Sequence, residues 1–168
     1  MGKNIVLVGL MGAGKTSVGR LLAEKFGLDF IDIDEFIEIN SKMSVSEIFS
    51  KYGEGWFREL EKDAIIVISK KNGSVVSTGG GALENEENLK NFQKNGTLIY
   101  LKTSPQILFE RVKKQNNRPL LQNENPLETL KILLKKRENN YLKADIIIET
   151  DKKTKEEIVK EIGEICKL

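Results

Sequence analysis

Apolar and polar positions follow one another in two different periods along the whole chain. Short apolar or alternating runs predict strands at residues 4–8, 29–34, 74–77, 97–101 and 145–148. Apolar residues spaced three or four apart predict helices at residues 16–26, 36–40, 44–70, 86–94, 105–114, 126–142 and 154–167. This alternation predicts an α/β fold with a five-stranded parallel sheet flanked by helices, whose ligands bind at the carboxyl ends of the strands.

Two segments depart from this regular alternation. A capping box, Ser44 with Glu47, opens the helix predicted at residues 44–70, and we expect Gly53 and Gly55 to break that helix. Residues 113–125 are polar, contain Pro119 and show no period. We expect residues 113–125 to form a mobile lid over a ligand site.

Length and composition limit the class of protein. The 168 residues, 39% of them hydrophobic, are enough for one globular domain spanning residues 1–168. A single cysteine, Cys166, excludes an internal disulfide, and apolar runs are too short to span a bilayer. We expect a cytoplasmic protein without a membrane partner. The net charge of +2 gives no support for a nucleic-acid partner, and the absence of heptads predicts a monomer.

The strongest candidate for chemistry is GLMGAGKT at residues 9–16, between a predicted strand and a predicted helix. It matches the P-loop, whose backbone N–H groups bind phosphate oxygens at a helix N-terminus. Lys15 would reach the β- and γ-phosphates, and the Thr16 hydroxyl would bind Mg²⁺. The predicted nucleotide contacts are Gly12, Ala13, Gly14, Lys15, Thr16 and Ser17. The motif therefore predicts a P-loop NTPase; the alternative is a glycine-rich turn that binds no phosphate.

Two aspartates follow at the end of the second predicted strand. Alternation places Asp32 and Asp34 on one face of this strand. We expect Asp32 to orient Mg²⁺, and Asp34 to orient or deprotonate the hydroxyl that accepts a phosphoryl group. The alternative is that Asp34 only caps a helix that begins at Glu35.

Arginine is rare in this chain, with five among 27 basic residues. Arg137 lies on an apolar helix stripe, and an inward arginine needs an anionic partner. Arg58 precedes Glu61 by three residues, so the two form a plain helical ion pair or Glu61 holds the guanidinium for a ligand carboxylate. Arg118, in the expected lid, would neutralise charge during phosphoryl transfer. Arg58 and Arg137 together predict a small anionic acceptor.

The turn Gly79-Gly80-Gly81 ends the third predicted strand. One glycine there would indicate only a tight turn. Three in succession let a ligand touch main-chain N–H groups, so we expect all three to contact the acceptor.

These motifs, taken in order, resemble the shikimate kinase family over essentially the whole chain. They are residues 9–16, Asp32-x-Asp34, Phe57-Arg58-x-x-Glu61, Gly79-Gly80-Gly81, Arg118-Pro119-Leu120 and Arg137 before Tyr141. The resemblance implies a P-loop NTPase fold of the nucleoside-monophosphate-kinase type. It also implies transfer of the ATP γ-phosphoryl group to the 3-hydroxyl of shikimate, in aromatic amino-acid biosynthesis through chorismate.

The same resemblance implies roles for individual residues. Asp34 engages the acceptor hydroxyls within an acceptor-binding region at about residues 34–61. Arg58 and Arg137 bind the shikimate carboxylate, and Gly80 adds a backbone contact. Lys15, Asp34 and Arg118 carry the catalysis. Arg111 packs beside the adenine, near residues 150–154, where relatives often have a proline and this chain has none.

Two other functions remain open from the residues alone. A kinase for another small acceptor, such as gluconate or a nucleoside monophosphate, shares the P-loop and lid but does not require Arg58, Arg137 and the triple glycine. A regulatory nucleotide switch is the second alternative, although the chain has no Asn-Lys-x-Asp tetrapeptide for reading guanine. Competition between acceptors would separate these functions.

Overall fold

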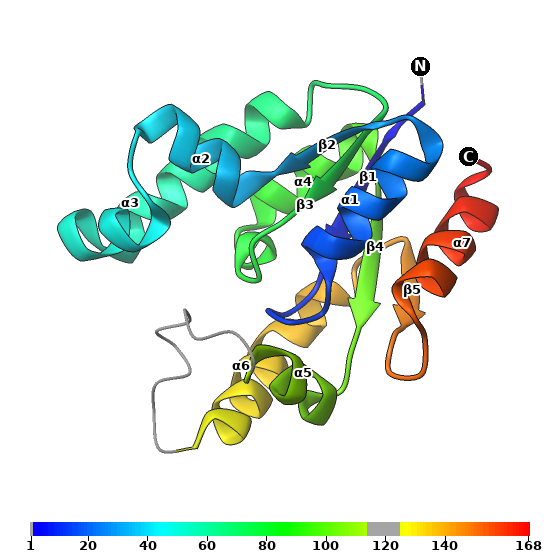
Figure 1. Ribbon diagram of the computed structural model, residues 1–168. Coiled ribbons are helices and arrows are strands. Elements are labelled where there is room, and N and C mark those ends of the chain that lie inside the picture. Colours follow the sequence, from blue (N-terminus) through cyan, green and yellow to red (C-terminus); the bar gives the residue numbers. More distant parts are fainter. Residues whose placement is uncertain (1, 114–124) are drawn as a thin grey trace.

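A computed structural model describes residues 2–113 and 125–168, and these form a five-stranded sheet with helices around it (Figure 1). All strand pairs are parallel, in the order β2-β3-β1-β4-β5, which confirms the predicted fold class. The strands are β1 Asn4–Val8, β2 Asp29–Asp32, β3 Ser74–Ser77, β4 Gly96–Lys102 and β5 Ile146–Glu149. The helices are α1 Lys15–Phe26, α2 Ile33–Ser41, α3 Val45–Ile68, η1 Ala82–Glu84, α4 Glu86–Asn95, α5 Pro105–Val112, α6 Pro126–Tyr141 and α7 Lys155–Cys166.

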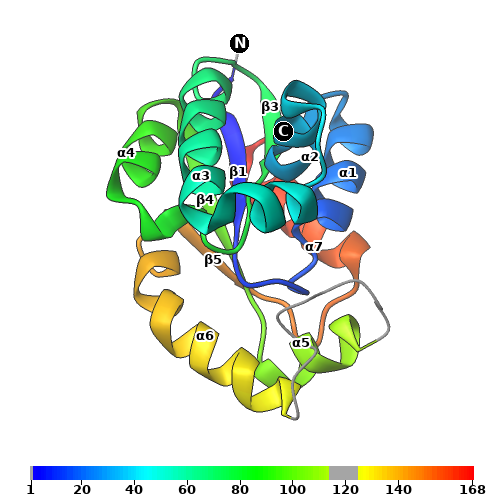
Figure 2. The ribbon, with the colours of Figure 1, turned by 90° about the vertical axis from the view of Figure 1, so that its left-hand side faces the viewer.

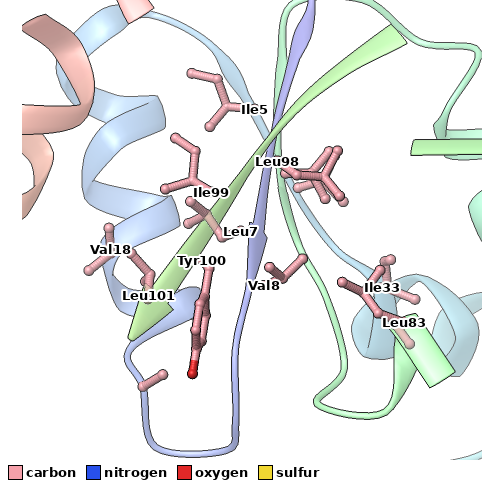
Figure 3. Close-up of a cluster of buried hydrophobic side chains, with 14 of the residues drawn as sticks. Ile5, Leu7, Val8, Val18, Ile33, Leu83, Leu98, Ile99, Tyr100 and Leu101 are labelled. Carbon is pink, nitrogen blue, oxygen red and sulfur yellow. The ribbon is translucent and has the colours of Figure 1, made fainter. Parts of the chain in front are cut away.

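Helices cover both faces of the sheet, with α3 and α4 on one face and α1 and α7 on the other (Figure 2). Every residue of the central strand β1 is buried, as expected for a parallel strand covered on both faces. In Figure 3, Ile5 and Ile99 point toward Val18 of α1, whereas Leu98 points to the opposite face. This packing fixes the strand ends from which the functional residues extend.

The end of β2 differs from the sequence prediction. β2 ends at Asp32 and α2 begins at Ile33, so the expectation that Asp32 and Asp34 share one face of a strand is wrong. The Asp32 carboxylate accepts hydrogen bonds from the backbone N–H groups of Asp34 at 3.0 Å and Glu35 at 3.4 Å. This N-cap satisfies first-turn donors and favours a helix over two more strand residues. Asp32, not Asp34, caps the helix.

The helix α3 begins and bends near the expected residues. Ser44 and Glu47 form the predicted capping box, in which each side chain accepts a hydrogen bond from the other residue's backbone N–H. The helix is broken at Gly53, whose φ of 80° and ψ of 175° are non-helical. Gly55 does not break it. Within the expected lid, residues 114–124, including Arg118, lie outside the described residues.

Candidate active site

The loop between β1 and α1 is a P-loop in structure as well as in sequence. Its glycines turn the chain with positive φ, and a Cβ on Gly12 would lie 2.7 Å from the Val112 side chain. Helix α1 starts directly after Gly14, which has no side chain to cap it, so first-turn N–H groups remain available to an anion. The Lys15 ammonium donates to the carbonyls of Gly9 at 2.8 Å and Leu10 at 3.0 Å. These contacts hold a buried cation at the mouth of the loop.

Arg111 reaches this loop from α5. Its guanidinium donates to the Gly12 and Ala13 carbonyls at 3.4 and 3.3 Å. Ser17 also contacts this loop, since its hydroxyl donates to the Gly14 carbonyl at 3.1 Å. The structure therefore brings Arg111 and the predicted P-loop residues together.

Side-chain oxygens that could hold a metal ion meet at the start of α1. The Thr16 hydroxyl donates to the Asp32 carboxylate at 2.9 Å and lies 3.3 Å from the Ser77 hydroxyl. A hydroxyl beside a carboxylate fits Mg²⁺, which takes one or two protein oxygens and completes its shell with water and phosphate oxygens. Among residues 2–113 and 125–168, no group of three or more histidine, cysteine, aspartate and glutamate side chains forms a denser metal site.

Asp34 lies in the first turn of α2, above the triple-glycine turn. A Cβ on Gly79 would lie 3.4 Å from one Asp34 carboxylate oxygen and 2.9 Å from Glu61 Oε1. The absence of a side chain at Gly79 thus leaves both carboxylates close to the turn. Although α2 replaced the predicted strand end here, Asp34 still lines the cavity that contains the P-loop.

Arg58 and Glu61 form an ion pair within α3. Arg58 Nη1 donates to Glu61 Oε2 at 2.7 Å, and the Glu61 side chain is 1% exposed. Burial raises the pKa of Glu61, and the charge of Asp34 adds to this rise against the opposing effect of Arg58. Within the described part of the chain, Glu61 Oε1 is buried and accepts no hydrogen bond. A buried, paired carboxylate of this kind differs from an ordinary surface ion pair.

Arg137 approaches the same turn from α6. The side chain is buried on the inward face of α6, as its place on the apolar stripe predicted. A Cβ on Gly80 would lie 3.6 Å from Arg137 Nη1, and a Cβ on Gly81 would lie 2.4 Å from Arg58 Nη2. Both guanidinium groups therefore lie against the triple-glycine turn.

Three features of the site were missed from the sequence. Arg137 Nε donates to Glu84 of η1 at 2.6 Å, and the Tyr141 hydroxyl donates to the Gly80 carbonyl at 2.5 Å. Burial raises the pKa of Tyr141, so it stays a donor. Ser77, beside Thr16, also escaped prediction. The partners of both α6 contacts lie more than 50 residues away in the chain, and no local pattern signals such contacts.

A cavity of about 1080 Å³ extends from the P-loop to Asp34 and the triple-glycine turn. Its lining comes from the P-loop, both aspartates, the first two glycines of the turn, α5 and the loop before α7; it includes Lys15, Thr16, Asp32, Asp34, Gly79, Gly80, Arg111, Asp151 and Lys153. Arg58, Glu61 and Arg137 adjoin the turn but are not part of this lining. In the part of the chain that the structure describes, no helix is long and apolar enough to cross a membrane.

Comparisons with known proteins agree with this geometry. The family model for shikimate kinase matches residues 11–167. The chain is 51% identical to a shikimate kinase of Thermodesulfovibrio yellowstonii, over 95% of this chain and 92% of that protein, and 46% identical to one of a Sulfurihydrogenibium species, over 95% of each. A solved structure of Acinetobacter baumannii shikimate kinase in complex with shikimate superposes with a TM-score of 0.93 at 38% identity, over 98% of this chain and 93% of that one. With its P-loop and its sheet both matched, the chain belongs to the shikimate kinase family.

Proposed function

We propose that the cavity between the P-loop and the triple-glycine turn is the place where this chain performs its family's reaction. As a member of that family, it is an enzyme that phosphorylates shikimate with ATP, in aromatic amino-acid biosynthesis. One observation carries the proposal for the site: a single cavity is lined both by P-loop residues and by Asp34. A phosphate-binding loop and a carboxylate near one another are what transfer to a hydroxyl requires.

In the nucleotide half, Lys15 and the first-turn N–H groups of α1 would bind the ATP phosphates together with Gly12, Ala13 and Gly14. The Thr16 hydroxyl and the Asp32 carboxylate would hold Mg²⁺, whose contribution when bound is to neutralise phosphate charge. Arg111, already in contact with the loop, would lie against the nucleotide. Arg118 stays a prediction as a charge-neutralising residue, because it lies outside the described residues.

In the acceptor half, Asp34 would accept a hydrogen bond from the 3-hydroxyl of shikimate, and would orient that oxygen for in-line attack or take its proton. Arg58 and Arg137, both beside the turn, would bind the shikimate carboxylate. The side-chain-free turn at Gly79, Gly80 and Gly81 would let the ring approach the main chain. Positioning and electrostatics then supply most of the rate acceleration.

Three broader expectations are retained as proposals: one domain over residues 1–168, a monomer, and a cytoplasmic location with neither nucleic-acid nor membrane partners. Their support is the chain's moderate length, near-neutral charge and single cysteine. Light scattering coupled to size-exclusion chromatography tests the monomer directly.

The test of the site is an ADP-release assay with Mg-ATP, in which shikimate is compared with quinate, gluconate and nucleoside monophosphates. We expect shikimate-dependent release, and Asp34→Asn should lower kcat by about 10²-fold or more because the hydroxyl loses its acceptor. Asp63→Asn, which changes an exposed carboxylate of α3, is the matched control and should behave like the unaltered protein. Near-normal turnover in Asp34→Asn would rule out this role for Asp34.

A further inference from the structure

Glu84 binds two cations at the end of the triple-glycine turn. It lies in η1, three residues after Gly81. One carboxylate oxygen accepts from Arg137 Nε at 2.6 Å, and the other accepts from the Lys136 ammonium at 3.0 Å. The Arg137 side chain is 9% exposed and that of Glu84 is 30% exposed. Glu84 is therefore the carboxylate that compensates the buried charge of Arg137 across two elements, η1 and α6.

The atom that Glu84 engages determines what Arg137 can do. An arginine side chain presents donors at Nε and at both terminal nitrogens. Glu84 engages Nε, and among residues 2–113 and 125–168 no carboxylate forms an ion pair with the terminal nitrogens. These nitrogens can therefore bind another anion, and Nη1 lies beside Gly80, which lines the cavity. Without this contact, the long side chain would have to be ordered when the acceptor binds, which weakens affinity.

Carboxylates also hold the second arginine at this turn, but through its terminal nitrogens. Arg58 Nη1 donates to Glu61 and Nη2 donates to Glu54, with Gly81 beside the guanidinium and Gly79 beside Glu61. Both arginines are thus ion-paired to carboxylates of this chain. Burial opposes ionisation of Glu84, but its contacts with Lys136 and Arg137 outweigh burial and lower the pKa of this carboxyl. Glu84 is therefore charged at neutral pH.

We infer that Glu84 is a positioning residue for the acceptor: by accepting the Nε–H of Arg137, it holds the guanidinium with its terminal nitrogens available to the acceptor carboxylate. The inference rests on the proposed function, in which Arg137 binds that carboxylate. Glu84 itself does not line the cavity. It acts through Arg137, so its removal should affect the KM for shikimate and leave the nucleotide half unchanged.

The experiment compares Glu84→Ala, Arg137→Ala and the double variant by steady-state kinetics in both substrates. Glu84→Ala should raise the KM for shikimate about fivefold to tenfold, the cost of ordering one long side chain, with kcat and the KM for ATP within about twofold of the unaltered protein. In the Arg137→Ala background the same change should add no further loss, because its effect passes through Arg137. Glu84→Gln, which keeps an oxygen acceptor, should recover part of the affinity.

The matched control is Glu87→Ala, which removes a nearby exposed glutamate whose ion pair with Lys62 lies outside the cavity; it should leave both KM values unchanged. An unchanged KM for shikimate in Glu84→Ala, or an equal loss in the Arg137→Ala background, overturns the inference while leaving the role of Arg137 intact. A normal KM for shikimate in Arg137→Ala itself overturns the carboxylate-binding role of Arg137 and this inference with it. Thermal unfolding of each variant identifies any change caused by misfolding.

Discussion

The nucleotide half and the acceptor half of this site are built in opposite ways. The nucleotide half is centred on a loop of consecutive residues, 9–16, whose shape is set by its own backbone and by the start of α1. The acceptor half brings together α2, α3, η1, α6 and the turn after β3, which are separated by up to about a hundred residues of chain. The centre of the nucleotide half is thus a local structure, to which Asp32, Ser77 and Arg111 are added from other elements. The acceptor half has no such local centre and exists only when the whole domain has folded.

This difference extends to how each half holds its cations. Lys15 is bound by carbonyls five and six residues away in its own loop. Arg137 is bound by a carboxylate 53 residues away on another element. A local loop positions its charge through backbone geometry alone, whereas an assembled site needs dedicated ion pairs to fix long side chains. In the acceptor half, the effect of a conservative change should therefore depend on whether it removes one of these ion pairs.

The largest expected effect comes from removing the cation of the nucleotide half. Lys15→Met should lower kcat by about 10²-fold to 10³-fold, because a buried charge beside the transferred phosphoryl group is lost. Binding of shikimate, measured by calorimetry without nucleotide, should stay within about twofold, since the proposed carboxylate-binding residues Arg58 and Arg137 lie on α3 and α6, away from the carbonyls that hold Lys15. Lys25→Met, at the exposed end of the same helix, is the control. A parallel loss of shikimate binding would contradict the separation of the two halves.

The sequence predicted the local half far better than the assembled one. The P-loop, its flanking strand and helix, and the bend at Gly53 follow from short-range rules of backbone geometry. The prediction that Asp34 lies on a strand was wrong. The alternating pattern at this point also fits a strand, but capping by Asp32 starts a helix instead.

The pairing of Arg137 with Glu84 could not be predicted, because it depends on how α6 packs against η1. For Arg58 and Glu61, the sequence supplied the spacing, and only the fold shows that Glu61 is buried and that Gly81 leaves room for the guanidinium. Burial and long-range contact are properties of the folded chain, so motif spacing alone does not determine them.

A single methyl group should disturb the acceptor half while leaving the P-loop intact. In Gly81→Ala the new Cβ would lie 2.4 Å from Arg58 Nη2, so the guanidinium must move. The backbone at Gly81 has a φ of −100°, which alanine accepts, and the fold should survive. We expect the KM for shikimate to rise about tenfold, the loss of one well-oriented charged contact, with an unchanged KM for ATP.

Gly55→Ala is the control for this variant, because a Cβ at Gly55 of α3 meets no atom within 4 Å. It should leave both KM values unchanged and stabilise the protein by about 0.5–1 kcal/mol through helix propensity. If Gly81→Ala raised the KM for ATP as much as that for shikimate, the turn would serve both halves of the site. That result would contradict their separation.

The smallest expected effect is a pH dependence confined to the acceptor half. Burial, together with repulsion by Asp34, raises the pKa of Glu61 above its ordinary value of 4.5 despite the opposing charge of Arg58. As the pH falls, Glu61 therefore takes up a proton earlier than an exposed glutamate would, and it loses the charge that holds Arg58. As the pH is lowered past the raised pKa of Glu61, we expect kcat/KM for shikimate to fall about twofold to fivefold, which is the scale of one partly screened ion pair. In Glu61→Gln this acid limb should disappear, because glutamine does not titrate, whereas kcat/KM for ATP at saturating shikimate should lack the limb in both proteins. The same acid limb in Glu61→Gln would assign the titration to another group and would remove the evidence that Arg58 depends on a charged partner.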